Sequence, residues 1–126
     1  MEASQTLKKN SDFRRLYAKG KSAVTPQVVV YCRRTGRQGN RVGITVSSKL
    51  GNAVQRNRVR RRLREIYRLN AARLRPGVDL VMVARVRGRY SSYWELEAAF
   101  LSACRKLGIL LEPPREEEAY RKEARL

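Results

Sequence analysis

Apolar residues recur with helical spacing in three segments of the chain. In the segment 7–19 they occupy positions i, i+3 and i+4, which predicts a short amphipathic helix with a buried side formed by Phe13, Leu16 and Tyr17. Ser11 is placed to cap this helix and Gly20 to end it. The segment 93–107 predicts a longer helix that stops at Gly108, with an inward side formed mostly by Trp94, Leu96, Phe100, Leu101, Cys104 and Leu107.

The helix predicted between these two follows Gly51 and extends over 52–74. Asn52 is its expected N-cap, because a side-chain oxygen there can accept hydrogen bonds from the first free backbone amides. Its apolar residues follow the spacing i, i+4, i+7 and i+8 and should pack on a core, at Val59, Leu63, Ile66 and Tyr67.

Three segments rich in β-branched residues predict strands, at 24–34, 41–47 and 79–85. Pro26 lies near the start of the first strand, where a missing amide does least harm. Residues 35–40, TGRQGN, are predicted to form a hairpin loop between the first two strands. The third segment, DLVMVAR, is nearly all apolar and fits a central strand covered on both faces.

This succession predicts one α+β domain, a sandwich of helices on a mixed four-stranded sheet, in the order α-β-β-β-α-β-α or α-β-β-α-β-α. The domain is expected to span residues 1–111. Residues 112–126 begin with a Pro pair and then become densely charged, so we expect a separate C-terminal tail, either a short helix or disordered.

The net charge of +18 is concentrated in the expected domain, because residues 112–126 hold five acids against four bases. Within 51–68 there are seven arginines and a single acid, Glu65. On a helix these arginines form a band, with Arg56, Arg60 and Arg64 along one flank and Asn57, Arg61, Arg64 and Arg68 along the next.

A solvated surface is the common explanation for a run of charge, but such a helix would interleave Glu with Lys. Like charges four residues apart repel by roughly a few tenths of a kcal/mol per pair. Arginine binds phosphate with two parallel hydrogen bonds, and a helix N-terminus adds free amides. The band therefore favours a nucleic-acid partner over a solvated or membrane-surface face.

Other residue types limit the alternatives. Cys32 and Cys104 lie in apolar surroundings, which suits buried free thiols in the cytoplasm better than a disulfide. The sequence has no histidine, so a protein-bound metal is not expected. MEASQTLKKN has no apolar export core, and no apolar run is long enough to span a membrane.

A self-sufficient nuclease is also disfavoured, because the sequence offers neither a histidine nor a paired carboxylate to activate water. Asp12, Glu65 and Asp79 stand alone in the sequence, and helix capping or helix ion pairing is the simpler use for each.

Three blocks, in order, resemble the protein component of bacterial ribonuclease P: KKNSDFRRLYAKGKS, RVGITVSSKLG and GNAVQRNRVRRRLRE. Arg56, Asn57 and Arg58 match the hallmark Arg-Asn-Arg of that family. The resemblance covers about residues 7–110, and it is specific because three ordered blocks agree, whereas an isolated Arg-Asn-Arg would mean little.

The resemblance implies an endoribonuclease that acts as a ribonucleoprotein and removes the 5′ leader from precursor tRNA. Catalysis would belong to the ribonuclease P RNA with Mg²⁺, and the protein alone would be inactive. The resemblance also implies a left-handed β-α-β crossover formed by 41–47, 52–74 and 79–85, where pattern alone favours a right-handed one.

The family's functional residues map onto two groups in this chain, neither of them catalytic or metal-binding. The group implied to bind the catalytic RNA comprises Lys49, Asn52, Arg56, Asn57, Arg58, Arg60, Arg61, Arg64 and Arg68. The group implied to bind the leader, in a cleft between the first helix and the sheet, comprises Phe13, Tyr17 and Tyr31.

Spacing alone makes Phe13 and Tyr17 ordinary core residues. Tyr31 is the stronger stacking candidate, since its neighbours Val30 and Cys32 would point inward by strand alternation. Composition alone also leaves open a structural RNA-binding protein of the ribosomal type. The acidic tail has no counterpart in the family's pattern.

Overall fold

The structure is a computed structural model that describes residues 5–111, so the predicted tail at 112–126 lies outside the described residues. The longer elements are α1 (Asn10–Lys19), β2 (Lys21–Val24), β3 (Val28–Arg34), β4 (Arg41–Thr45), α2 (Ala53–Asn70), β5 (Val78–Ala84) and α3 (Tyr93–Lys106). The short ones are β1 (Gln5–Thr6) and the 3₁₀ turns η1 (Ser48–Leu50), η2 (Ala71–Arg73) and η3 (Val86–Tyr90). From α1 onward the order is the first of the two predicted.

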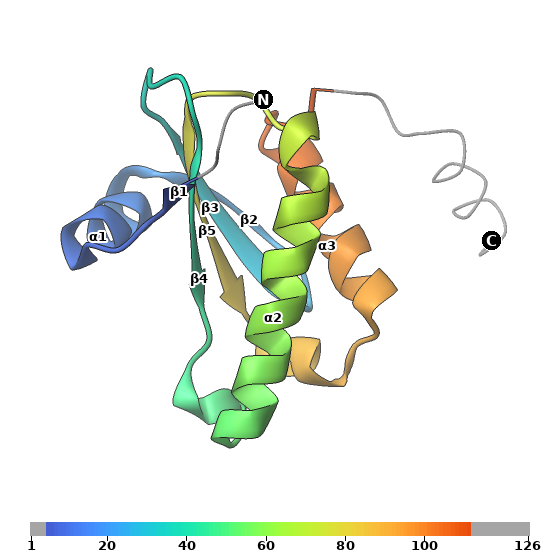
Figure 1. The fold of residues 1–126 in the computed structure, drawn as a ribbon. Coiled ribbons are helices and arrows are strands. Elements are labelled where there is room, and N and C mark those ends of the chain that lie inside the picture. Colours follow the sequence, from blue (N-terminus) through green and yellow to red (C-terminus); the bar gives the residue numbers. More distant parts are fainter. Residues whose placement is uncertain (1–4, 112–126) are drawn as a thin grey trace, which may run out of the picture.

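The sheet lies between two helical layers, with α1 on one face and α2 and α3 on the other (Figure 1). Its strand order is β1-β4-β5-β3-β2. β5 is parallel to β4 and antiparallel to β3, so the sheet is mixed. The predicted α+β fold is confirmed, and the two-residue β1 adds an edge strand that the pattern did not predict.

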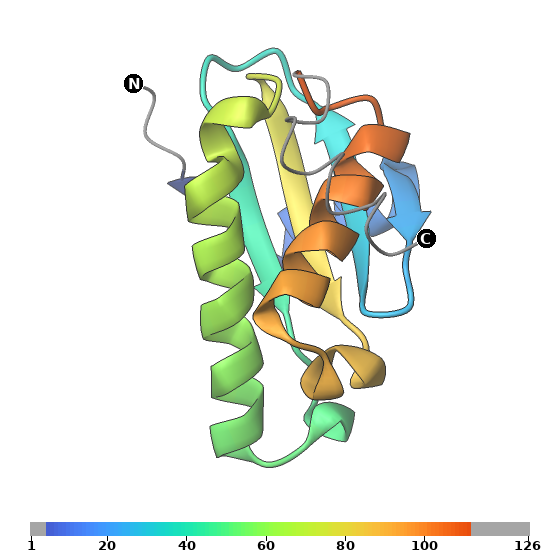
Figure 2. The same cartoon turned by 90° about the vertical axis from the view of Figure 1, so that its right-hand side faces the viewer.

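The connection from β4 through α2 to β5 is left-handed. Figure 2 shows β4 and β5 running downward side by side, while α2 rises in front of them and lies nearer to β4. The rarer hand, implied by the family resemblance, is therefore present, and a rule based on strand twist alone would have given the opposite one.

The predicted hairpin between 24–34 and 41–47 is wrong, because β5 inserts between β3 and β4. Residues 35–40 instead bridge over the start of β5. Asn40 accepts a hydrogen bond from the Val78 amide at 2.9 Å and donates to the Arg75 carbonyl at 3.0 Å. Gly77, with φ +79°, turns the chain beneath Arg37, where a side chain would meet the Arg37 carbonyl.

The strand predicted at 24–34 begins only at Val28, as β3, and Pro26 lies in the turn that joins it to β2, an earlier strand that the pattern did not predict. Thr25 closes that turn, since its hydroxyl donates to the Val28 carbonyl at 2.6 Å and accepts from the Val28 amide at 3.0 Å. A local turn motif therefore separates β3, which is rich in β-branched residues, from β2, whose sequence is KSAV.

Two details of the predicted helices are also wrong. α1 begins at Asn10 after Lys9, which makes no side-chain cap hydrogen bond, so Ser11 lies inside the helix rather than at its cap. Trp94, expected on the inward side of α3, is 58% exposed. The other residues expected on that side lie in or against the core, and Gly20 accounts for the end of α1.

Two clusters of apolar side chains fill the space on either side of the sheet. The larger lies under α2 and α3 and contains the whole predicted α2 stripe: Val59, Leu63, Ile66 and Tyr67. The smaller lies under α1 and is built on Leu7, Leu16 and Val81. Cys32 and Cys104 are buried, as predicted, and are free thiols. Burial raises the pKa of both thiols, that of Cys104 to about 12.

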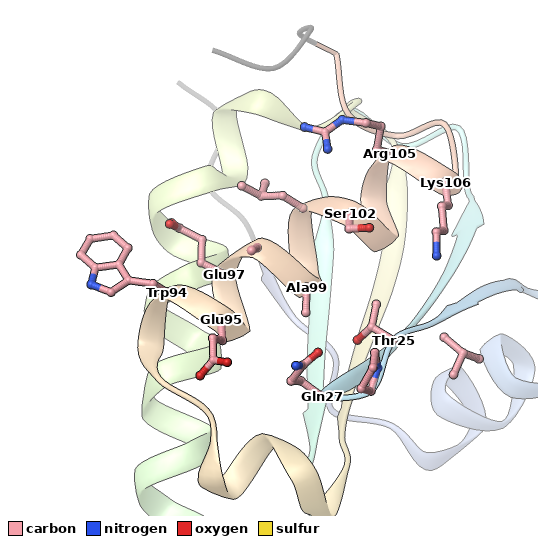
Figure 3. A pocket seen from close by; sticks show the side chains of 13 residues that line it. Thr25, Gln27, Trp94, Glu95, Glu97, Ala99, Ser102, Arg105 and Lys106 are labelled. Carbon is pink, nitrogen blue, oxygen red and sulfur yellow. The ribbon is translucent and has the colours of Figure 1, made fainter. Parts of the chain in front are cut away.

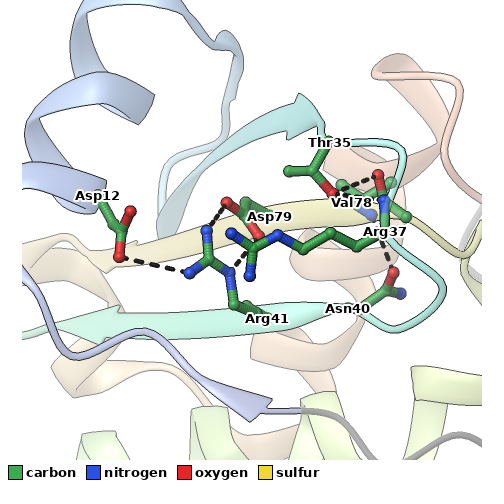
Figure 4. Close-up of polar contacts among 8 residues, drawn as sticks. Asp12, Thr35, Arg37, Asn40, Arg41, Val78 and Asp79 are labelled. Atoms are coloured by element: carbon green, nitrogen blue, oxygen red, sulfur yellow. Dashed lines mark hydrogen bonds and ion pairs between the residues drawn. The ribbon is translucent and has the colours of Figure 1, made fainter.

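An ion cluster links α1 to the middle of the sheet (Figure 4). The Arg41 guanidinium binds both carboxylate oxygens of Asp79, with its Nε 2.8 Å from Oδ1, and reaches Asp12 on α1 at 3.4 Å. These hydrogen bonds, chiefly those to Asp79, raise the pKa of Arg41. Neither Asp12 nor Asp79 caps or pairs within a helix, so the prediction for these two is wrong. Glu65 does form the expected pair, with Arg68.

We expect Asp79→Asn to lower the free energy of unfolding by about 3 kcal/mol, because a mostly buried guanidinium would lose its principal charged partner. The side chains of Arg41 and Asp79 are only 15% and 7% exposed. Urea unfolding followed by circular dichroism measures the change. Glu65→Gln is the matched control, since it removes a carboxylate from an exposed pair and should leave unfolding almost unchanged. Equal losses of unfolding free energy in the two variants would show that the buried cluster stabilises the fold no more than an exposed ion pair does.

Candidate nucleic-acid interface

The N-terminus of α2 is built by a reciprocal capping box. The Asn52 side chain accepts from the Gln55 amide at 2.9 Å, and the Gln55 side chain accepts from the Asn52 amide at 2.9 Å. The predicted cap is confirmed. This pairing fixes the direction in which the helix leaves η1.

The predicted arginine band occupies the side of α2 that faces away from the core. Asn57, Arg58, Arg61, Arg64 and Arg68 are exposed, and Arg56 and Arg60 are half-buried along one flank. Lys49 is exposed on η1, just before the helix. All of the band residues therefore have solvent access on one elongated surface, which a polyanion could follow.

Three arginines of the band already have partners within the protein. Arg56 donates to the Gly51 carbonyl at 2.9 Å, and Arg60 donates to the Asn57 side-chain oxygen at 2.8 Å. Arg68 binds both oxygens of Glu65 at 2.8 Å, and this contact lowers the pKa of Glu65. These contacts orient the guanidinium groups, and each guanidinium keeps further N–H donors for phosphate.

The three aromatic residues of the second group meet on the α1 face of the sheet. The rings of Tyr17 and Tyr31 are 4.9 Å apart and edge-to-face, with an interplanar angle of 79°. The Tyr17 hydroxyl is 3.1 Å from the Thr45 hydroxyl. Phe13 lies directly over Gly43 of β4, since a Cβ atom at that glycine would be 2.6 Å from Phe13 Cζ.

The three aromatic side chains differ in burial, and so in how well a base could stack on them. Phe13 and Tyr31 are half-buried and pack against the smaller core, as spacing suggested for Phe13. Tyr17 is 41% exposed, although spacing alone placed it in the core. The expected alternation is present around Tyr31, because Val30 and Cys32 are buried on the opposite face. Tyr17 rather than Tyr31 therefore offers the more open ring.

The arginine band and the aromatic face are separated by the sheet. Figure 1 places α1, which supplies Phe13 and Tyr17, on the side of the sheet opposite to α2. Two chemistries suited to RNA, phosphate binding by arginine and base stacking by aromatics, are thus presented on opposite faces of one rigid core.

The model of the family described as Ribonuclease P matches residues 1–108. The chain belongs to the ribonuclease P protein family. It is 40% identical over 110 residues to the ribonuclease P protein component of Alkaliphilus metalliredigens, a match that covers 87% of this chain and 99% of that protein. It is 42% identical over 110 residues to that of Alkaliphilus oremlandii, covering 87% and 96%.

Solved structures of ribonuclease P proteins share the fold. The protein from Staphylococcus aureus is 31% identical with a TM-score of 0.75, covering 85% of this chain and 97% of that one. The protein from Thermotoga maritima is 30% identical with a TM-score of 0.71, covering 78% and 93%. The chain is thus a protein subunit of ribonuclease P, the ribonucleoprotein that matures tRNA 5′ ends.

Sequence reasoning missed two arginines that position the candidate interface of this ribonuclease P protein. Arg62 donates to the Ser91 carbonyl at 3.1 Å, and Arg89 donates to the Leu50 carbonyl at 3.0 Å. Both bonds join segments about thirty to forty positions apart in the sequence. The neighbouring sequence gives no signal that separates arginines with such internal hydrogen bonds from the other arginines.

A hollow of about 450 Å³ lies between α3 and the β2–β3 turn (Figure 3). Its wall carries carboxylates of Glu95 and Glu97 as well as the cations Arg105 and Lys106. Mixed charge of this kind does not favour a polyanion, so the hollow is not part of the candidate RNA interface of the ribonuclease P protein.

Two further findings concern the described part of the chain. Between residues 5 and 111, no three side chains of His, Cys, Asp or Glu gather in a way that could hold a metal ion. None of the helices in this range combines the length and hydrophobicity that a bilayer-spanning segment requires.

Proposed function

We propose that this ribonuclease P subunit holds two RNA molecules at once, ribonuclease P RNA on the α2 band and the 5′ leader of precursor tRNA on the aromatic face. The observation that carries this proposal is the placement of the two groups on opposite faces of the sheet. A protein with one RNA-binding surface could bind either RNA, but it could not hold them together in a fixed relation.

The α2 band suits a folded RNA because its charge is dense and oriented. Exposed Arg61 and Arg64 lie within a turn of each other on the outer side of the helix. Guanidinium groups bind phosphate oxygens in pairs, and each bound phosphate releases condensed counterions. The mutual repulsion of the arginines, unfavourable in the free protein, is relieved when phosphates neutralise them.

The aromatic face suits an unpaired strand, because flexible single-stranded bases can stack on protein rings. Tyr17 presents the most open ring, with Tyr31 against its edge and Phe13 on the same helix. Arg14 and Arg15 are exposed on α1 and can bind the phosphates of the same strand. Stacking is tolerant of base identity, as a leader of variable sequence requires.

Catalysis is assigned to the RNA partner, with Mg²⁺ bound there. The described residues do not fit a metal site, since no ligand set of three acidic, histidine or cysteine side chains comes together. The protein contributes positive charge that lowers the repulsion between catalytic RNA and precursor tRNA. A cytoplasmic location is proposed with this role, because both buried cysteines are free thiols.

Reconstitution tests the proposed division of labour. The protein alone should not cleave precursor tRNA, and its addition to a bacterial ribonuclease P RNA should lower the Mg²⁺ concentration needed for cleavage, because arginines replace part of the divalent screening. Cleavage is followed on a gel across a Mg²⁺ titration. Cleavage by RNA-free protein, or an unchanged Mg²⁺ requirement, would contradict the proposal.

Arg61→Ala with Arg64→Ala should weaken binding to ribonuclease P RNA and flatten its salt dependence. The slope of log K against log salt should fall by about 0.7 to 0.9 for each phosphate that the variant no longer binds. Filter binding over a series of salt concentrations measures this slope. Both side chains are exposed and lie outside the buried stripe, so the circular dichroism spectrum should not change.

Arg34→Ala with Arg37→Ala is the matched control for this double variant. It removes the same charge from two exposed side chains away from the α2 band. Equal effects of the two double variants would show that net charge alone attracts the RNA and that α2 is not the binding surface.

Tyr17→Ala should lower the affinity of the holoenzyme for precursor tRNA by about 5- to 150-fold, because it removes the ring on which one base stacks. Mature tRNA, which has no leader, should bind as before. Tyr17→Phe is the control, because it keeps the ring and removes only the hydroxyl that faces Thr45. If Phe weakens binding as much as Ala does, or if mature tRNA affinity falls equally, Tyr17 does not stack on the leader.

A further inference from the structure

Tyr90 is an aromatic side chain that neither the fold nor the proposed RNA surfaces use. It ends η3 and is 72% exposed. The guanidinium carbon of Arg89 lies 4.9 Å from the centre of its ring, so a cation covers part of the ring while most of it remains open to solvent. A ring this exposed contributes little to the core, and its open face is available to a ligand.

The segment that carries Tyr90 is held on three sides. Arg89 donates to the Leu50 carbonyl at 3.0 Å, which ties η3 to η1. Arg62 of α2 donates to the Ser91 carbonyl at 3.1 Å. Gly88 is buried so close to the β2–β3 turn that a Cβ atom there would lie 2.7 Å from the Gln27 carbonyl oxygen. Tyr90 is therefore presented by an anchored turn, which lowers the entropy lost when a ligand stacks on it.

The position of η3 links Tyr90 to the α2 surface rather than to the aromatic face under α1. Arg62 of α2 binds the residue that follows η3, and Arg58 lies one turn before Arg62 on the same flank of α2. Figure 2 shows η3 below α3, beside the lower half of α2, on the face that turns away from α1. Arg89 and Tyr90 thus extend the arginine band sideways from Arg58.

We propose that Tyr90, with Arg89 against its ring, is a stacking site for an unpaired base of ribonuclease P RNA. The base would stack on the open face of Tyr90, while Arg58 and Arg89 bind the adjoining phosphates. Aromatic and guanidinium groups side by side are the combination that single-stranded nucleotides bind. The inference rests on the proposed function, because it takes ribonuclease P RNA as the partner of the α2 surface.

The test measures affinity for ribonuclease P RNA and its salt dependence in Tyr90→Ala, Tyr90→Trp and Trp94→Ala. Tyr90→Ala should weaken binding by about 5- to 150-fold with an unchanged salt slope, because it removes a ring and no charge. Tyr90→Trp should bind at least as tightly as the parent protein. Trp94→Ala removes another exposed aromatic, on α3, and should have little effect.

The outcomes separate this inference from the proposed function. If Arg61→Ala with Arg64→Ala weakens RNA binding while Tyr90→Ala does not, the stacking site is wrong and the α2 surface stands. If neither weakens binding, both proposals fail. If Tyr90→Ala and Trp94→Ala weaken binding equally, or if Tyr90→Ala lowers only the affinity of the holoenzyme for precursor tRNA, the assignment to ribonuclease P RNA is overturned. Urea unfolding of each variant identifies any loss caused by misfolding.

Discussion

The fold depends on a central strand that must be buried on both faces. Leu80 and Met82 of β5 face the larger core, and Val81 faces the smaller one. A strand of this kind needs apolar cover on each side, and the chain supplies it with α1 on one face and α2 and α3 on the other. The separation of the arginine band from the aromatic face follows from this requirement, since the helices that carry them are the cover.

The arginine band places many like charges on one helix of the domain. Neighbouring guanidinium groups repel, so the helix depends on its buried apolar stripe and its N-terminal cap for stability. Val59, Leu63 and Ile66 are buried against the sheet, and the capping box at Asn52 satisfies the first amides. Within the band, the Glu65 carboxylate offsets one cation and the Asn57 oxygen orients another. The remaining repulsion is a free-energy cost that the proposed binding of phosphates would relieve.

The features that could be predicted from the sequence are those that depend on residues close together in the chain. The stripe and cap of α2, the nearly all-apolar β5 and the burial of both cysteines each follow from residues close in the chain. The strand order does not, because β5 pairs with residues of β4 and β3 that lie 38 to 56 positions earlier in the chain. The Arg41–Asp79 ion pair could not be predicted either, because its two residues are also far apart in the sequence. Asp79 looks isolated in the sequence because its partner is distant along the chain.

The candidate site shows the same limit. The helical spacing of the arginines predicted their shared surface, whereas the arginines that serve as tethers, Arg62 and Arg89, could not be told from the others. The leader group was placed by resemblance to a family, not by pattern. Spacing predicts that Tyr17 is in the core. The way α1 packs against the sheet instead leaves the Tyr17 ring accessible, while Phe13 and Tyr31 are more buried.

Gly43 gives the aromatic face a consequence beyond its own position. The Phe13 ring rests on bare backbone there, because the space that a side chain would fill is already occupied by the ring. The depth at which α1 sits on the sheet is thus set by the smallest residue in β4. A side chain at that position would push Phe13 and α1 away from the sheet, so that Tyr17 on α1 would move relative to Tyr31 on β3. In the proposed leader-binding role of Tyr17 and Tyr31, Gly43 thus sets the relative position of the two rings from beneath the aromatic face.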